Sequence, residues 1–217
     1  MLYVVSTPIG NLGDITYRAV EVLKSVDLIA CEDTRHARIL TRHYGISVPL
    51  TSYYEYNKVM KGDHLIKLLK EGKRIALISD AGTPGISDPG FTLIRDALNA
   101  GIKVISIPGP TALISALSIS GFPTNKFVFE GFLPPKSGAR KKKLQSLKKL
   151  EATVVLYESP HRILATLQDM QEVLGNRKIA IAREVTKKFE EVIRGDIATL
   201  RSTLKASKPR GEFVVIF

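Results

Sequence analysis

The sequence predicts an α/β protein made of two α/β domains. Short apolar runs alternate with segments of helical periodicity, and glycine- and proline-rich turns follow several of the apolar runs. The stretch "GFPTN" at 121–125 is typical of a hinge, and the alternation of strands and helices starts again after it. Such βαβ order favours a mostly parallel sheet with helices on both faces. We therefore expect one domain over 1–120 and a second over 121–217.

The first domain begins with an apolar run that predicts a buried strand. Helices are expected where apolar residues recur every three or four positions, and glycines mark several helix ends. The predicted order is strand 2–6, helix 16–26, strand 27–31, helix 34–45, helix 57–72, strand 74–79, helix 91–101, strand 103–107 and helix 111–120.

The second domain repeats this alternation with more lysine in its helices. Its expected order is strand 126–132, helix 138–150, strand 153–159, helix 160–174, strand 178–184, strand 190–195, a short helix from Asp196, and strand 211–217. We find no internal sequence repeat.

The charge of the chain is strongly positive and unevenly distributed. The net charge is +11, with 13 Lys/Arg against 11 Asp/Glu in residues 1–120 and 19 against 10 in residues 121–217. An excess of cations in one half favours a polyanionic partner, whereas a lysine-rich solvated surface is the plainer interpretation.

Cysteine usage and hydropathy exclude several protein classes. The single cysteine, Cys31, rules out disulfide frameworks and thiolate zinc clusters, and its apolar neighbours indicate a buried residue. The four histidines show no metal-ligand spacing, so no metal site is expected. The N-terminus lacks the pattern of a signal peptide and no apolar run reaches membrane-spanning length. We expect a cytoplasmic protein.

Three turns rich in glycine and proline follow predicted strands, at 6–14, 79–90 and 107–112. Ligands of open α/β sheets collect at the carboxyl ends of strands, where turns expose backbone N–H groups. Glycine lets the backbone approach a ligand closely and proline keeps the turn rigid. Tight βα turns without a ligand are the alternative, but three successive turns of this kind favour a binding site.

The residues in these turns limit the classes of ligand that they can bind. None has the Lys-Ser/Thr of a Walker loop, and "GNLGD" is not the dinucleotide fingerprint, which leaves an NAD enzyme as a weaker alternative. A ligand with few negative charges, held by backbone groups and a few hydroxyls, fits better. Adenosine attached to an amino acid is one such ligand.

The strings "STPIGNLGD", "CEDTRHA", "SDAGTPGISDPG", "IPGPTA", "YESPHR" and "AREVTKKFEE" together resemble the bacterial RsmI family. Its members are methyltransferases of the small ribosomal subunit that modify a cytidine ribose 2′-O in 16S rRNA, and they belong to the tetrapyrrole-methylase superfamily. The resemblance runs from Tyr3 to Phe217. It implies two α/β domains with S-adenosylmethionine bound in a cleft between them, and a homodimer. Family members commonly carry a further small C-terminal segment, which we expect this chain to lack.

The resemblance also implies which residues bind the cofactor. Asp80 takes the place of the acidic residue in the superfamily's Gly-Asp-Pro loop, and the other positions lie on the matched turns or close the cleft. The full set of implied cofactor-binding residues is Pro8, Ile9, Asp80, Thr83, Gly85, Thr111, Ala112, Tyr157, Arg183 and Gly211.

Methyl transfer to a ribose hydroxyl needs alignment of the nucleophile and help with its proton. We predict Asp33 or Glu158 as the base and Arg35 and Lys187 as groups that orient the substrate. Two of these residues have a structural alternative: Asp33 can cap the following helix, and the string around Lys187 can be a surface cluster of ion pairs.

The run "KSGARKKKLQSLKKL" is expected to contact the RNA backbone without reading sequence, although a solvated helix face is the ordinary interpretation. The leading hypothesis is therefore an rRNA 2′-O-methyltransferase that uses S-adenosylmethionine. A methylase of a tetrapyrrole or another small molecule is the second hypothesis, and a non-catalytic RNA-binding protein is the third.

Overall fold

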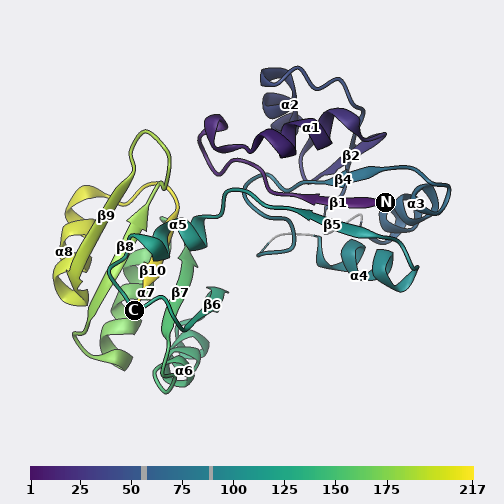
Figure 1. The fold of residues 1–217 in the computed structure, drawn as a ribbon. Coiled ribbons are helices and arrows are strands. Elements are labelled where there is room, and N and C mark those ends of the chain that lie inside the picture. The colour runs from purple at the N-terminus through teal and green to yellow at the C-terminus, as the bar shows by residue number, and fades with distance from the viewer. Residues whose placement is uncertain (55–57, 88–89) are drawn as a thin grey trace. The chain divides into compact units, whose positions relative to one another are not determined.

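The computed structural model describes residues 1–54, 58–87 and 90–217. Its contacts divide the chain into two compact units, Met1–Thr111 and Ala112–Phe217. The sequence placed the helix at 111–120 at the end of the first domain, whereas in the structure this helix packs with the second unit, against its last strand. Each unit contains a five-stranded sheet covered by helices, so the α/β class is confirmed (Figure 1).

The first unit contains a fully parallel sheet. Its strands are β1 (Leu2–Val5), β2 (Leu28–Cys31), β3 (Leu50–Ser52), β4 (Ile75–Leu77) and β5 (Val104–Ile107), in the spatial order β3-β2-β4-β1-β5. Every neighbouring pair is parallel, as the alternation of strands and helices predicted. The short strand β3 was not predicted.

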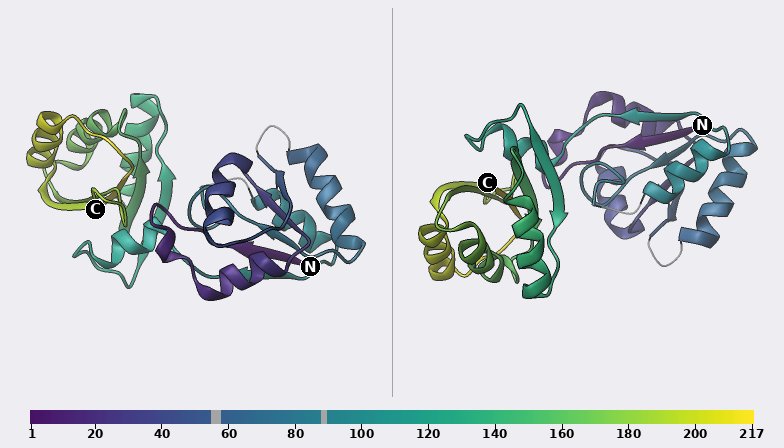
Figure 2. Two further views of the ribbon diagram at one scale, coloured as in Figure 1. Left: turned by 90° about the horizontal axis from the view of Figure 1, so that it is seen from above. Right: turned by 90° about the horizontal axis from the view of Figure 1, so that it is seen from below.

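Two helices cover each face of this sheet. Buried residues of α1 (Tyr17–Ser25) and α2 (Thr34–His43) pack with Val5, Ile29 and Ile78 on one face. Residues of α3 (Lys58–Lys70) and α4 (Phe91–Asn99) pack with Leu2 and Leu77 on the other. The two layers of helices can be followed in Figure 1 and, from above and below, in Figure 2. A single turn of 3₁₀ helix, η1, spans Leu12–Asp14. The predicted start of α3 at Asn57 lies outside the described residues.

The second unit contains a mixed sheet. Its strands are β6 (Phe127–Phe132), β7 (Thr153–Glu158), β8 (Lys178–Arg183), β9 (Glu191–Asp196) and β10 (Phe213–Ile216), in the order β6-β7-β10-β8-β9. Only the β6–β7 pair is parallel, and the other three pairs are antiparallel. The expectation of a mostly parallel sheet is therefore wrong for this half of the chain, because the last strand enters between β7 and β8 and a short loop joins β8 to β9.

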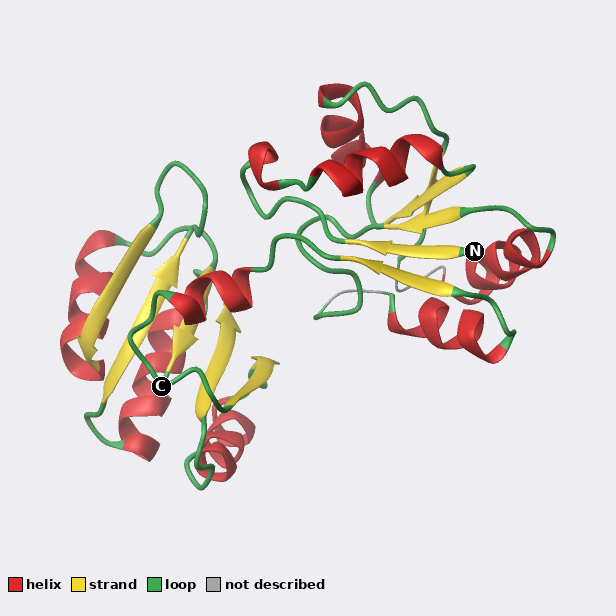
Figure 3. Cartoon of the chain, viewed as in Figure 1, coloured by secondary structure: helices red, strands yellow, loops and turns green. Residues whose placement is uncertain are grey.

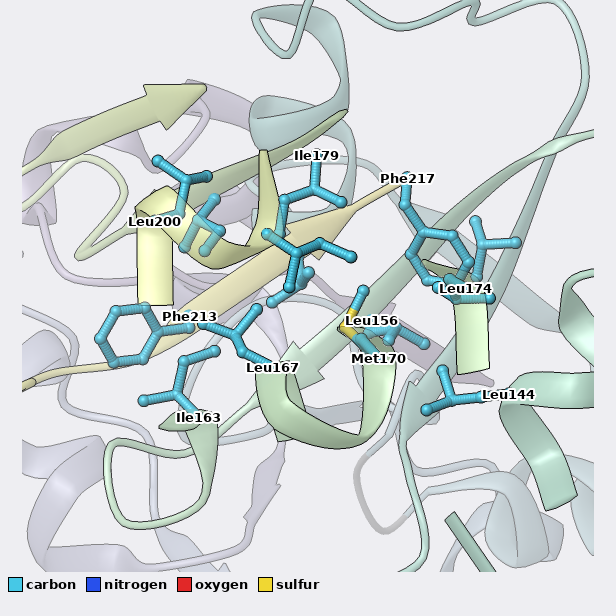
Figure 4. Packing of buried hydrophobic residues seen from close by; sticks show 14 of the residues in the cluster. Leu144, Leu156, Ile163, Leu167, Met170, Leu174, Ile179, Leu200, Phe213 and Phe217 are labelled. Atoms are coloured by element: carbon cyan, nitrogen blue, oxygen red, sulfur yellow. The ribbon is translucent and has the colours of Figure 1, made fainter. Parts of the chain in front are cut away.

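The helices of the second unit cover its sheet unevenly. The helices α6 (Ser137–Leu147), α7 (Ile163–Leu174) and α8 (Ile197–Ser207) share one core with residues of the sheet, among them Leu156 and Phe213 (Figure 4). The short helix α5 (Ala112–Ser118) packs on β10. No helix in the described part of the chain is long and apolar enough to span a membrane.

Candidate functional site

The turns that follow β1, β2, β4 and β5 all lie at one edge of the parallel sheet, because parallel strands end at the same side (Figure 3). This edge contains the three glycine-rich turns and the acidic string after β2. Residues 88 and 89 of the second glycine-rich turn lie outside the described residues.

Hydrogen bonds join the first two glycine-rich turns. The backbone N–H of Thr7 donates to the carbonyl of Gly82 at 2.9 Å, and the N–H of Gly82 donates to the carbonyl of Thr7 at 3.0 Å. The hydroxyl of Ser6 hydrogen-bonds that of Thr83 at 2.8 Å. These hydrogen bonds fix the two turns against each other.

Glycines allow this close approach at two positions. A Cβ on Gly109, in the turn after β5, would lie 3.0 Å from the Cβ of Ser6, which is closer than side chains normally come. At Gly82 the space would admit a Cβ, but the φ of +79° lies in the left-handed region that favours glycine. Packing therefore requires glycine at position 109, and backbone conformation favours it at position 82.

The acidic string after β2 is tied to the same edge. The carboxylate of Asp80 accepts the backbone N–H of Asp33 at 3.2 Å. Asp33 is the N-cap of α2 and accepts the backbone N–H of Arg35 at 2.7 Å, and the guanidinium of Arg35 pairs with the same carboxylate at 2.7 Å. These hydrogen bonds from Arg35 lower the pKa of Asp33 to about 2. Such a carboxylate is a weak proton acceptor at neutral pH.

Glu32 lies beside this pair and was not among the predicted site residues. Burial raises the pKa of Glu32 above its ordinary value, and the negative charges of Asp80 and Asp33 raise it further. The preceding Cys31 is buried, and its burial raises the pKa of the thiol to about 12, which makes it an inert residue of the core. The sequence signal for Glu32 was its place directly after a buried strand.

The carboxylates give the edge a negative character that fits some ligands and not others. The charges of Asp33 and Asp80 lie close enough to Glu32 to raise its pKa. Phosphate groups would be repelled there, whereas a ligand with a cationic group would be attracted. Within the described residues, no group of three or more His, Cys, Asp or Glu side chains could hold a metal ion.

In the second unit, Tyr157 lies at the end of β7 and reaches the start of α5. Its hydroxyl accepts the backbone N–H of Leu113 at 3.1 Å, and its ring makes edge contacts with Phe129 and Phe132. The structure thereby brings two predicted cofactor positions together, Tyr157 and Ala112, the residue just before Leu113.

Glu158, one of the two predicted bases, is buried, with only 2% of its surface exposed. Its carboxylate accepts the backbone N–H of Ser159 at 2.8 Å and the hydroxyl of Thr166 at 2.7 Å, and it pairs with Arg162 at 3.4 Å. Arg162 also donates to the carbonyls of Leu133 and Pro134. This arrangement holds the turn between β7 and α7 and explains the cation at the start of that helix.

Lys187, a predicted substrate-orienting group, bridges two carboxylates. Its ammonium lies 3.0 Å from Glu184 Oε1 and 2.8 Å from Glu212 Oε2. Burial lowers the pKa of Lys187, but the hydrogen bonds to both carboxylates outweigh it and leave the pKa above its ordinary value. The side chain of Glu184 also occupies the space beside Gly211, where a Cβ would lie 2.4 Å from its Cγ. The predicted cofactor residue Arg183 precedes this cluster and pairs with Glu191 at 2.9 Å.

The basic run around α6 is less exposed than its sequence indicated. Arg140 is buried and pairs with the buried Asp169 at 2.7 Å. Lys141 pairs with Glu172, and Lys143 pairs with Glu130. Three of the seven cations in this run are therefore paired within the unit. The other four, Lys136, Lys142, Lys148 and Lys149, are exposed.

Comparisons with known proteins identify the family of the chain. The family model of the tetrapyrrole (corrin/porphyrin) methylases matches residues 1–201. A protein of Synechocystis named ribosomal RNA small subunit methyltransferase I is 52% identical over 217 residues, which are 100% of this chain and 78% of that protein. A protein of Thermotoga maritima with the same name is 48% identical over 215 residues, covering 99% of this chain and 96% of that protein.

Two solved structures share the fold. Diphthine synthase matches with a TM-score of 0.76 at 14% identity, over 100% of this chain and 89% of that one. Uroporphyrin-III-C-methyltransferase from Thermus thermophilus matches with a TM-score of 0.69 at 22% identity, over 99% of this chain and 93% of that one. Together with the near-complete match to the family model, these likenesses show that the chain belongs to the tetrapyrrole methylase family, within its group of ribosomal RNA small subunit methyltransferase I proteins.

Proposed function

We propose that the protein is a methyltransferase that transfers a methyl group from S-adenosylmethionine to 16S rRNA of the small ribosomal subunit, at the ribose 2′-OH of a cytidine. The observation that carries the proposal is 52% identity, over the whole chain, to a protein named ribosomal RNA small subunit methyltransferase I. The positive charge of the chain, +11, supports a nucleic-acid substrate.

The edge of the parallel sheet fits the cofactor. S-adenosylmethionine supplies an activated methyl group, so the protein mainly has to bind it, align the acceptor and exclude water. Its sulfonium and ammonium are cationic, and the carboxylates Asp80 and Glu32 suit them where they would repel phosphate. In this proposal Pro8, Ile9 and Thr83 line the binding edge. Gly85, Thr111, Ala112, Tyr157, Arg183 and Gly211 complete the proposed set of cofactor residues.

The proton of the ribose hydroxyl needs an acceptor. Asp33 and Glu158 were predicted for this step, but both carboxylates already accept several hydrogen bonds from the protein. Their geometry supports a positioning role instead. The pKa of Glu32 is raised by burial, so its carboxylate is a stronger proton acceptor than that of Asp33, and in this proposal Glu32 takes the proton. In the proposal, Arg35 and Lys187 orient the substrate.

The test uses S-adenosylmethionine labelled at its methyl group. The protein is incubated with 30S subunits, with naked 16S rRNA or with a tetrapyrrole precursor, and the label is mapped. We expect label on a ribose of 16S rRNA. Label on the tetrapyrrole alone would support the second hypothesis, a small-molecule methylase, which the shared fold with uroporphyrin-III-C-methyltransferase favours.

The remaining parts of the proposal concern organisation. We propose that residues 1–120, with their glycine-rich turns, supply most of the cofactor-binding residues and that the basic residues 121–217 add RNA contacts. We also propose that the enzyme acts in the cytoplasm as a homodimer, which the family resemblance implies. Sedimentation equilibrium tests the dimer, and a monomer at micromolar concentration would contradict it.

A further inference from the structure

The outward face of α2 presents cationic side chains and no carboxylate. The helix Thr34–His43 contains Arg35, Arg38, Arg42 and two histidines and no acidic residue. Its buried residues Ala37, Leu40 and Thr41 pack toward the sheet. The cationic side chains, together with Ile39, are exposed on the opposite side.

The arginines of the first unit differ in whether their side chains have partners within the protein. Of the six arginines in residues 1–111, four bind groups of the protein itself. Arg18 donates to a backbone carbonyl, Arg35 and Arg95 pair with adjacent aspartates, and Arg74 pairs with Asp27. The remaining two, Arg38 and Arg42, both lie on α2, and the side chain of neither forms an ion pair or donates a hydrogen bond within the described part of the chain.

The spacing of these arginines forms a track along the helix. Residues 35, 38 and 42 are separated by three and four positions, which places them on one side of an α-helix. At a rise of about 1.5 Å per residue, the track extends about 10 Å from Arg35 to Arg42. Its first residue lies directly beside the acidic string at the proposed cofactor edge.

The chemistry of the side chains indicates the partner. Guanidinium groups form paired hydrogen bonds with phosphate oxygens in a geometry that lysine cannot match. An exposed row of arginines without neighbouring carboxylates on its helix is complementary to a polyanion with regularly spaced charges. We infer that Arg38 and Arg42 bind backbone phosphates of the RNA strand that leads to the reacting nucleotide. This inference rests on the proposed function and assigns a surface of the first unit to the substrate.

The test compares two double variants of equal charge change. Arg38→Gln/Arg42→Gln removes the track, and Lys67→Gln/Lys70→Gln removes two exposed cations from α3, which packs on the other face of the same sheet. Binding to 30S subunits and to a single-stranded RNA oligonucleotide is measured between about 50 and 300 mM salt, where the Debye length falls from about 14 to about 6 Å. Methylation kinetics and calorimetric binding of S-adenosylmethionine are measured in parallel.

The arginine variant should bind RNA about 10- to 30-fold more weakly at 0.1 M salt, and the slope of log affinity against log salt should fall by about 1.4, since each phosphate contact contributes about 0.7. The KM for 30S subunits should rise while kcat and the cofactor affinity stay unchanged. The lysine variant should resemble the wild type.

Equal losses in the two variants, or an unchanged salt slope in the arginine variant, would overturn the inference. A change of oligomeric state caused by Arg38→Gln/Arg42→Gln would also overturn it, because the surface would then be a contact between copies of the chain. Failure of the wild-type protein to methylate 30S subunits would instead refute the proposed function, so the two outcomes are distinguishable.

Discussion

Glu158→Gln separates a structural role of this carboxylate from a catalytic one. The side chain of Glu158 is 1% exposed, and its two oxygens accept the backbone N–H of Ser159 and the hydroxyl of Thr166. Glutamine has nearly the same shape, but it replaces one accepting oxygen with a donor and removes the charge that faces Arg162. The substitution therefore changes hydrogen bonding and charge with little change in volume.

The expected cost follows from these contacts. Removing one partner of a buried ion pair costs about 3–5 kcal/mol. Arg162 keeps its hydrogen bonds to the carbonyls of Leu133 and Pro134, which reduces the penalty. We expect the free energy of unfolding to fall by about 2–3 kcal/mol. Urea denaturation followed by circular dichroism measures this loss. The control is Glu172→Gln on the exposed side of α7, which removes only a surface ion pair and should leave the free energy of unfolding nearly unchanged.

A catalytic role of Glu158 would change the measured quantities in the opposite way. Loss of a general base lowers kcat by about 10²- to 10⁴-fold without a matching loss of stability. A Glu158→Gln protein as stable as the wild type, with kcat reduced by a hundredfold or more, would refute the structural reasoning and support Glu158 as the base.

Three further predictions concern other contacts. Gly109→Val should weaken S-adenosylmethionine binding at least tenfold in calorimetry, because its side chain would push the turns after β1 and β5 apart; unchanged affinity would contradict this. The pKa of Asp33 is lowered to about 2, so its pairing with Arg35 stabilises the folded state above about pH 4, and this contribution disappears as the pH falls toward 2. Asp33→Asn keeps the helix cap, so its urea midpoint should approach that of the wild type over this range, and a constant difference would count against the pairing. Asp169→Leu should destabilise the protein by about 3–5 kcal/mol, since it leaves the buried Arg140 unpaired, and Arg140→Leu in addition should recover much of this loss in urea denaturation.

The periodicity of apolar residues and the glycines at helix ends predicted most helices and strands of the first unit. The strand β3 was missed because it has three half-buried residues at the edge of the sheet, directly after Pro49. Such a segment has neither the length nor the continuous apolar run that identifies a buried strand. The parallel order of the other strands followed from the helices between them.

The second sheet was harder to predict because strand order depends on contacts distant in sequence. Its last strand, β10, pairs with both β7 and β8, so the end of the chain forms the middle of the sheet. Apolar runs identify the strands, but they do not show which strands will pair in the sheet.

The partners of charged side chains were equally difficult to predict from the sequence. "KSGARKKKLQSLKKL" reads as a uniform basic surface, yet Arg140 is buried against Asp169, a residue 29 positions away on another helix. Glu158 likewise follows a strand, as a catalytic carboxylate would, but Thr166 and Arg162 surround it in the fold. Sequence spacing predicts which residues lie at a strand end, whereas the partners that occupy them come from tertiary packing.

The connection between β2 and α2 changes the sign of its charge within a few residues. Glu32 and Asp33 lie at the sheet edge beside Asp80, and every charged residue from Arg35 to Arg42 is cationic. A cationic methyl donor and a polyanionic acceptor require opposite fields at neighbouring positions, and either field alone would repel one of the two substrates. The ion pair of Asp33 with Arg35 lies at the boundary between the acidic residues and the cationic helix α2. Because these two charges neutralise each other, the negative and positive potentials overlap less. This local reversal of charge is what a site for S-adenosylmethionine and RNA needs, and a methylase of an uncharged small molecule would have no use for the cationic half.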